Sequence, residues 1–338
     1  MSHIAIIGAG GWGTTLGLVA GRAGHVVRLW SRNAEVVSGI NGRGVNGVYL
    51  AAHEITGDVR ATCELGEAAR EAQIVILAAP SHATRGLLEL IAGDLRADVV
   101  LVSATKGIEI ETGQRMSEVA GEVLGKEFAA RFVCLSGPSF AQEVAAGHPT
   151  AVVAAGYDAR ATLAVQAALS FENFRVYTNG DLAGTELGGA VKNVIALAAG
   201  MVSGLGLGTN SIAALITRGL AEMTRLALAE GGRIETLAGL AGLGDLVLTC
   251  TGALSRNRYV GQELGRGRAL AEILSGMHEV AEGVRTTRAV KLLADSRHIE
   301  MPITEQVHAV LYEGKSVRAA AGDLMARPLR GEFSGVGL

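Results

Sequence analysis

One lysine lies within an apolar stretch that has the length of a buried helix. Residues 185–199 read TELGGAVKNVIALAA, with Lys192 as the only cation. A helix that is apolar on nearly every side is normally buried, and burying an ammonium is costly unless a partner or ligand meets it. Helical spacing places four small residues on roughly the face of this lysine: Gly188, Gly189, Ala196 and Ala199. Because they would leave room over the amine, we expect Lys192 to serve as a general acid and base.

A structural role for the same lysine is the alternative. Lys192 would then reach the surface along its own stem, or pair with Glu186 in the same stretch. Structural ion pairs also perturb lysines, so the stretch alone does not decide between the two.

A glycine-rich turn follows the first strand signal. The strand expected over residues 3–7 runs into Gly8, Gly10, Gly11, Trp12 and Gly13, and a helix pattern starts at residue 14. This is G-x-G-x-x-G in strand–turn–helix context, which predicts a dinucleotide site with the pyrophosphate at the helix N-terminus.

The second strand signal ends without the acidic residue that usually binds the ribose hydroxyls of NAD. It is followed by Arg32, which can meet a 2′-phosphate instead, so the sequence favours NADP or dual use. The alternative is an ordinary surface arginine.

Further polar residues follow later strand signals or begin helices. Lys106 comes after the strand expected over residues 99–103, and a second ammonium near Lys192 would lower the pKa of both. Asp245 could orient Lys192 or a substrate hydroxyl, or simply cap the segment 246–249. Ser255 and Arg256 open a helix pattern, where a cation opposes the helix dipole unless an anion binds there; the alternative is a solvated basic turn.

The order of patterns predicts an α/β Rossmann-type parallel sheet domain followed by an all-α domain. Strands are expected over residues 3–7, 26–30, 74–78, 99–103, 132–135, 151–155 and 174–177, with helices between them. After about residue 180 the strand signals end and long helix patterns follow. We expect an NAD(P)-binding domain over residues 1–182, a helical substrate domain over 183–333 and a flexible tail over 334–338.

Composition excludes several classes of protein. The 338 residues are 49 % hydrophobic with a formal net charge of −3, which indicates neither nucleic-acid binding nor a polybasic membrane patch. Cys63, Cys134 and Cys250 are few, odd in number and far apart, which is typical of reduced thiols in a cytoplasmic protein and not of a disulfide framework or metal site. The uncharged run 193–217 is long enough to mimic a membrane span, but its glycines and polar groups favour two buried helices.

Several segments together resemble bacterial NAD(P)-dependent glycerol-3-phosphate dehydrogenase, over nearly the whole chain and in order. They are residues 8–13, 106–109, 135–141, 186–193, 239–245 with 248–251, 255–257 and 280–287. The resemblance implies reversible reduction of dihydroxyacetone phosphate to sn-glycerol 3-phosphate for phospholipid synthesis, with NADP(H) or NAD(H) as cofactor.

The resemblance also implies roles by position. Lys192 is the implied acid/base residue, with Lys106 and Asp245 beside it. The implied substrate residues are Lys106, Gly137, Ser139, Lys192, Asp245, Ser255, Arg256 and Asn257. The implied cofactor residues are Gly8, Gly10, Gly11, Trp12, Gly13, Arg32, Tyr49, Lys106, Ala141, Arg256, Val280 and Glu282. A homodimer is possible by analogy alone.

The chain departs from the family pattern at four positions. Gly11 stands where serine is common, Ala51 where proline is common, and Ser203 and Thr209 where aspartate is common. Two other functions remain open: a β-hydroxyacid or 6-phosphogluconate-type dehydrogenase, and a catalytically inactive NADP sensor. Such a sensor need not keep a buried lysine, so Lys106, Lys192 and Asp245 together argue against it.

Overall fold

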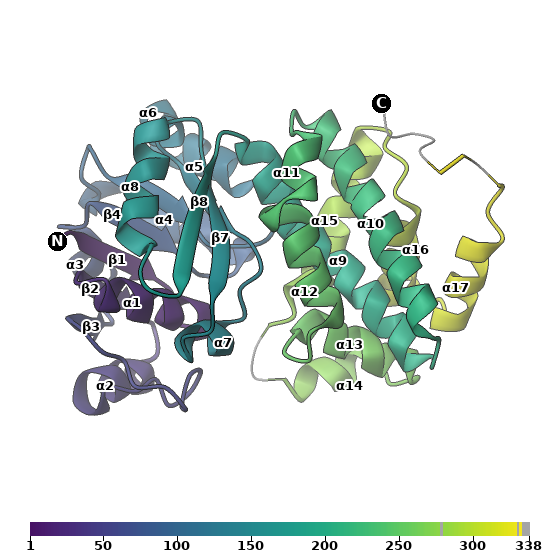
Figure 1. Ribbon diagram of the computed structural model, residues 1–338, viewed down its shortest axis with the longest axis horizontal. Helices are drawn as coiled ribbons and strands as arrows, with labels where there is room; N and C mark the ends of the chain where they lie inside the picture. The colour runs from purple at the N-terminus through teal and green to yellow at the C-terminus, as the bar shows by residue number, and fades with distance from the viewer. Residues whose placement is uncertain (278–279, 330, 333–338) are drawn as a thin grey trace. The chain divides into compact units, whose positions relative to one another are not determined.

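The computed structural model describes residues 1–277, 280–329 and 331–332 (Figure 1). These form two compact units. The first comprises Met1–Thr105 and Met116–Leu182, and the second comprises Lys106–Arg115 with the described residues from Ala183 onward. The expected division after residue 182 did not include the segment Lys106–Arg115, which belongs to the second unit. The tail expected over residues 334–338 lies outside the described residues.

The first unit is built on one eight-stranded sheet of order β3-β2-β1-β4-β5-β6-β7-β8. Its strands are β1 (His3–Ile7), β2 (Val26–Trp30), β3 (Val59–Thr62), β4 (Ile74–Leu77), β5 (Val100–Ser103), β6 (Val133–Ser136), β7 (Thr150–Ala155) and β8 (Phe174–Asn179). Its helices are α1 (Gly11–Arg22), α2 (Ala34–Arg43), α3 (Leu65–Ala69), α4 (Ser81–Ile91), α5 (Met116–Leu124), α6 (Lys126–Ala130), α7 (Ala141–Ala145) and α8 (Ala159–Leu169), with a 3-10 turn over Ala92–Asp94.

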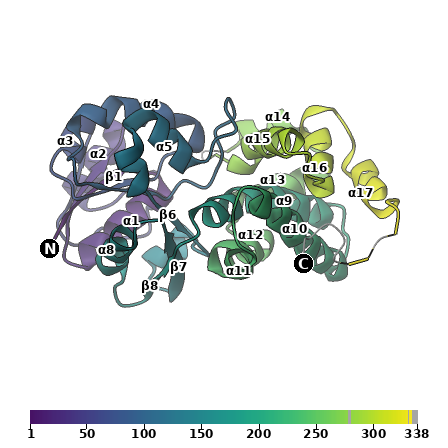
Figure 2. The same cartoon turned by 90° about the horizontal axis from the view of Figure 1, so that it is seen from above.

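Both faces of the central strands are covered by helices. On β1, Ile4 and Ile6 belong to one buried cluster, whereas Ala5 and Ile7 belong to another on the opposite face. Figure 2 shows α4 and α5 on one side of β1, and α1 and α8 on the other. A strand buried on both faces must be apolar at every position, which explains the continuous apolar runs in the sequence.

The sheet is parallel as expected except at one pairing. Strand β7 runs antiparallel to β6, with Leu135 opposite Ala154, whereas the other neighbouring strands pair in parallel. The seven expected strands lie within two residues of their observed bounds. Strand β3 was missed because it is a four-residue edge strand, VRAT, with polar residues at alternate positions.

From Ala183 onward, the described residues of the second unit form helices and the turns that join them. Its elements are α9 (Leu182–Gly204), α10 (Thr209–Ala229), α11 (Ile234–Ala238), a π-helical turn η2 (Leu240–Gly244), α12 (Asp245–Thr251), α13 (Arg256–Gly265), α14 (Leu270–Ser275), α15 (Glu282–Ser296), α16 (Pro302–Tyr312) and α17 (Val317–Met325). Figure 1 shows α9 among α10, α12 and α15. Among the described residues, α9 alone is long and apolar enough to cross a membrane, but 83 % of its most apolar window is buried within the protein.

Helices α9 and α13 approach each other backbone to backbone through two pairs of glycines. A Cβ on Gly261 would lie 2.0 Å from the Leu197 carbonyl oxygen, and one on Gly200 would lie 2.1 Å from that of Arg258. Gly204 and Gly265 extend the contact by one helical turn. Because α9 carries Lys192 and α13 carries Arg256, these glycines fix the distance between the two helices that bear candidate site residues.

Replacing one of these glycines should cost stability. We expect Gly261→Ala to lower the free energy of unfolding by about 3 kcal/mol or more, because the contact is with backbone and the helices must separate. Gly322→Ala in α17 is the matched control: its added Cβ would meet nothing within 4 Å, so alanine should be neutral or stabilising. Urea unfolding of both variants gives the comparison, and equal effects would contradict the packing argument.

Candidate active site

Three charged side chains meet inside the second unit. The Lys192 Nζ lies 2.5 Å from Asp245 Oδ1, and the Lys106 Nζ lies 2.7 Å from Asp245 Oδ2. The exposed side-chain fractions of Lys192, Asp245 and Lys106 are 7 %, 1 % and 16 %. The Lys192 Nζ also donates to the Thr249 hydroxyl oxygen at 2.9 Å. One carboxylate therefore bridges two ammonium groups in a largely dry environment.

Local structure explains why Asp245 reaches Lys192. The π-helical turn η2 ends at Gly244, and Asp245 is the first residue of α12. Thr249 follows one turn later on the same face, and its hydroxyl donates to the Asp245 carbonyl oxygen at 2.6 Å. Single π turns inside helices are frequently found at functional sites because they redirect side chains.

The structural alternatives for Lys192 and Asp245 are not observed. Lys192 is buried and so does not reach the surface, and Glu186 pairs with Arg115 at 3.3 Å. Among the described residues, no side chain caps the start of α12, so Asp245 is not a cap.

The expectation that small residues leave room over the amine was wrong for Gly188. A Cβ there would lie 2.7 Å from the Ala241 carbonyl oxygen, so this glycine admits the η2 backbone.

Burial and neighbouring charges set the ionisation of the cluster. Burial, which Asp245 opposes and Lys106 reinforces, lowers the pKa of Lys192 to about 8. Burial alone would raise the pKa of Asp245, but Lys106 and Lys192 together hold it below its ordinary value. With two ammonium groups and one carboxylate, the cluster carries a net charge of +1. It can therefore stabilise a developing oxyanion and donate a proton to it near neutral pH.

Two asparagines connect this cluster to α13 and α15. The Asn193 side-chain amide donates to the Lys106 carbonyl oxygen at 3.2 Å, and its Oδ1 accepts from Asn257 Nδ2 at 2.9 Å. Asn257 Oδ1 in turn accepts from the Gly283 backbone N–H at 2.9 Å. Both functional groups of the Asn257 side chain are thus engaged with protein.

The start of α13 has the form expected from the sequence. Ser255 is the N-cap, and its hydroxyl accepts from the Arg258 N–H at 3.2 Å. Arg256 is the first helical residue and is exposed, whereas Ser255 and Asn257 are buried. A basic first turn of this kind, with no acidic residue in it, suits an anion.

The glycine turn of the first unit lies at the switch point of the sheet, between β1 and β4. Gly8 has φ +116°, and a Cβ there would lie 2.9 Å from the Ala78 carbonyl group. A Cβ on Gly13 would lie 1.8 Å from the Gly8 oxygen, so α1 packs directly on the turn. A Cβ on Gly10 would meet nothing within 4 Å, and Gly11 follows it as the first residue of α1.

This geometry fits a pyrophosphate. The side of the turn at Gly10 is open, and no side chain caps the N-terminus of α1 among the described residues. Backbone N–H groups at such an end, in the crevice where the strand order reverses, are the usual dinucleotide phosphate site. The residues present therefore fit the nicotinamide cofactor that the sequence pattern indicated.

Other expected cofactor residues surround this turn. The Trp12 ring packs against Phe174 with centroids 6.4 Å apart. Arg32 is exposed directly after β2. Asn46, which the sequence analysis missed, donates to the Ala9 carbonyl oxygen at 2.9 Å and accepts from the Tyr49 N–H at 3.2 Å, which ties the Tyr49 loop to the glycine turn.

Three further residues of the first unit lie after β6. Gly137 has φ +133° and lies against Val152, where its Cβ would come within 3.0 Å of the Val152 Cα. The Ser139 hydroxyl donates to the Gly137 carbonyl oxygen at 3.1 Å. Ala141 begins α7, and its carbonyl oxygen accepts from the Thr15 hydroxyl of α1 at 3.1 Å.

Val280 and Glu282 belong to the second unit, at the start of α15. The structure therefore brings Lys106, Lys192 and Asp245 into direct contact, and joins Asn257 to them through Asn193. Thr249 and Asn193 were not assigned roles from the sequence. Their signals were present: a hydroxyl one helical turn after Asp245, and a polar residue beside the buried lysine.

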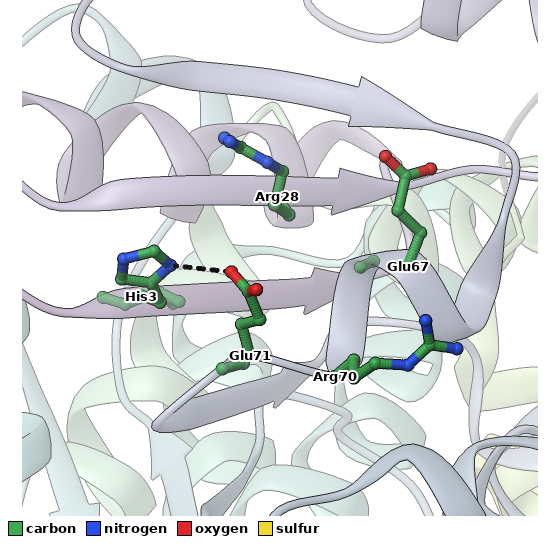
Figure 3. A pocket seen from close by; sticks show the side chains of 8 residues that line it. His3, Arg28, Glu67, Arg70 and Glu71 are labelled. Carbon is green, nitrogen blue, oxygen red and sulfur yellow. Dashed lines mark ion pairs between the residues drawn. The ribbon is translucent and has the colours of Figure 1, made fainter.

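A surface pocket of the first unit lies between β1, β2 and the segment of helix α3 and the residues that follow it (Figure 3). Its charged lining mixes both signs: His3, Arg28, Glu67, Arg70 and Glu71. His3 and Glu71 form an exposed ion pair at 3.8 Å. The glycine turn is at the opposite, carboxyl end of β1, so this pocket is not the dinucleotide crevice.

Comparison with known proteins agrees with this geometry. Family models for the NAD-dependent glycerol-3-phosphate dehydrogenase N-terminus and C-terminus match residues 3–162 and 181–322. A glycerol-3-phosphate dehydrogenase [NAD(P)+] of Koribacter versatilis is 56 % identical over 330 residues, covering 97 % of this chain and 98 % of the relative. This chain belongs to the NAD-dependent glycerol-3-phosphate dehydrogenase family.

Further members support the assignment. The glycerol-3-phosphate dehydrogenase [NAD(P)+] of Geobacter sulfurreducens is 52 % identical, with 98 % of each chain covered. The crystal structure of the Coxiella burnetii glycerol-3-phosphate dehydrogenase superposes with a TM-score of 0.92 at 40 % identity, covering 96 % of this chain and 99 % of that one. Members of the family are oxidoreductases that use NAD or NADP, and the fold expected from the sequence is confirmed at the level of a Rossmann-like unit and a helical unit.

Proposed function

We propose that this chain interconverts dihydroxyacetone phosphate and sn-glycerol 3-phosphate, with Lys192 as the proton donor and acceptor. The observation that carries the assignment of Lys192 is its buried contact with Asp245, which also binds Lys106. A net positive, water-poor cluster suits a carbonyl oxygen that becomes an alkoxide and must gain a proton.

The bound nicotinamide cofactor supplies or accepts the hydride at the substrate carbon. Lys192, as the ammonium, donates its proton to the carbonyl oxygen in the direction of reduction. Asp245 keeps the Lys192 amine oriented and balances part of the charge, while Lys106 adds a second cation that attracts the anionic substrate. In the reverse direction the neutral Lys192 amine removes the hydroxyl proton.

The phosphate of the substrate is assigned to the start of α13. Ser255 organises this helix end, Arg256 supplies an exposed guanidinium, and Asn257 holds the helix to Asn193 and α15. The resemblance to the family adds Gly137 and Ser139 as substrate residues. Their contact with substrate stays a proposal.

The cofactor is assigned to the glycine turn Gly8–Gly13 with Arg32, Tyr49 and Ala141. Lys106, Arg256, Val280 and Glu282 are added on the family resemblance alone. The exposed position of Arg32 after β2 supports a contact with the 2′-phosphate of NADP.

The proposed reaction also suggests a role in the cell. We infer a cytoplasmic enzyme that supplies glycerol 3-phosphate for phospholipid synthesis, and analogy with other dehydrogenases adds a homodimer to this proposal. The net charge of −3 gives no support to nucleic-acid binding, and the burial of α9 supports a soluble protein.

The direct test is the loss of NADPH absorbance with purified protein and dihydroxyacetone phosphate, repeated with NADH. Rapid oxidation that depends on the substrate supports the proposal. Tight NADPH binding without oxidation would contradict it and would direct attention to other phosphorylated carbonyls.

Replacing Arg32 tests the cofactor preference. We expect Arg32→Ala to raise the KM for NADPH about tenfold or more and to leave that for NADH nearly unchanged, because only NADPH carries the 2′-phosphate. Arg60→Ala on the edge strand β3 is the control, since Arg60 is also exposed in the same unit. Equal losses for both cofactors would refute the assigned contact.

A further inference from the structure

The segment Lys106–Arg115 folds back on itself inside the second unit. Ile108 and Arg115 form an isolated antiparallel bridge, and the Glu109 N–H donates to the Gln114 carbonyl oxygen at 2.9 Å. The Gly113 N–H donates to the Glu109 carbonyl oxygen at 2.9 Å, which closes the turn. Because the two arms are paired, the position of Arg115 also sets that of Ile108, two residues after Lys106.

Both arms of this loop are anchored in the helical core. Ile108 is 1 % exposed and belongs to the cluster formed around α9. Arg115 pairs with Glu186 of α9 at 3.3 Å, and their side chains are only 12 % and 5 % exposed. A buried ion pair is costly to desolvate, so it holds a fixed geometry more than it adds stability.

The same helix that anchors Arg115 carries the acid/base residue. Glu186 precedes Lys192 by six residues on α9, and the Lys106 carbonyl oxygen accepts from Asn193 of that helix at 3.2 Å. The loop is thus fastened to α9 at its beginning and at its end. Lys106 projects from the first of these points to Asp245 at 2.7 Å.

We propose that Arg115 and Glu186 are positioning residues, whose ion pair holds the Lys106–Arg115 loop so that the Lys106 ammonium stays on Asp245 beside Lys192. This rests on the proposed function of Lys106, Lys192 and Asp245. Arg115 and Glu186 do not touch the reacting atoms; they act through the loop. A small displacement of a positioned cation is enough to lower turnover by about a hundredfold.

The test neutralises the pair and follows both rate and pH dependence. We expect Arg115→Met and Glu186→Gln each to lower kcat by about tenfold to a hundredfold. The double variant Arg115→Met/Glu186→Gln should lose no more than either single variant, because both substitutions release the same loop. It removes both charges of the buried pair at once, so it keeps the test valid if a single variant folds poorly.

The pH profile separates positioning from a general loss of structure. The reduction rate falls at alkaline pH as Lys192 loses its proton, and this fall is the alkaline limb of the pH profile. Since the Lys106 ammonium lowers the pKa of Lys192, displacing Lys106 should move the alkaline limb to higher pH. The titratable groups that face Lys192 are Asp245, Lys106 and Cys250, and burial raises the pKa of the Cys250 thiol to about 12, so this thiol stays neutral. Lys291→Met, which breaks the exposed Lys291–Asp295 pair of α15, is the control and should change neither kcat nor the limb.

Lys106→Met, measured in parallel, distinguishes a failure of the positioning role from a failure of the proposed function. If Lys106→Met is nearly inactive while the folded double variant turns over within twofold of the wild type, the positioning role is overturned and the proposed function stands. If Lys106→Met turns over as the wild type does, both are overturned. Loss of rate in the double variant without any shift of the limb also overturns the positioning role.

Discussion

Lys192→Ala is expected to lower kcat for reduction by about 10²–10⁴-fold, as the loss of a general acid should. The side chain is buried and bonded to Asp245 and Thr249, so its removal takes away the ammonium that these two residues hold in place. Because the loss is chemical, the KM for the cofactor should change little. Steady-state kinetics with NADPH and dihydroxyacetone phosphate give the comparison.

Two controls make this result specific. Lys192→Met fills a similar volume without the amine and should be equally slow, whereas Lys291→Ala, which only removes the pair with Asp295 in α15, should be unaffected. Added methylamine should partly restore the alanine variant, since it can occupy the vacated space and donate a proton. A Lys192→Ala enzyme within threefold of the wild type would remove this lysine from the mechanism.

The wild-type pH dependence follows from the same residue. The pKa of Lys192 is lowered to about 8, so reduction, which needs the ammonium, should slow as pH rises through that value. Oxidation, which needs the neutral amine, should instead rise with pH and level off above it.

Asp245→Asn is expected to lower kcat/KM for reduction by about a hundredfold, because it removes the group that orients both lysines. It should also change the pH profile in a defined direction. Asp245 raises the pKa of Lys192 and Lys106 lowers it, so without the carboxylate the alkaline limb should move to lower pH. The measurement is kcat/KM for reduction between about pH 6 and about pH 10, which extends about two units on each side of the Lys192 pKa of about 8.

Asp323→Asn is the matched control for this substitution. Asp323 is exposed and pairs with Lys315 in the same unit, so its neutralisation should leave the profile unchanged. An unmoved limb in Asp245→Asn, or a limb moved to higher pH, would mean that Asp245 does not face the protonated Lys192 during turnover.

Much of the fold follows from local pattern, as the first strands show. Ile4 to Ile7 is apolar at each position, which requires burial on both faces, and Gly8 and Gly13 of the turn need a conformation or a close approach that glycine alone allows. Helix α2 was missed although it carries readable end signals, an Asn33 cap and Gly44 at φ +65°. The antiparallel β7 was not predictable, because strand direction depends on the connection and leaves no mark in a run of apolar residues.

The sequence by itself determined that a buried lysine, a dinucleotide turn and a basic helix start occur in one chain, because each depends on neighbours within a few residues. Only the tertiary structure decided which charges meet. Glu186 is the acidic residue closest to Lys192 in sequence, yet it pairs with Arg115. Asp245, which lies 53 residues from Lys192 in the chain, is the carboxylate that binds it. The physical reason is packing: Gly188 admits the η2 backbone to α9, and the burial of the amine then requires the carboxylate that this turn presents.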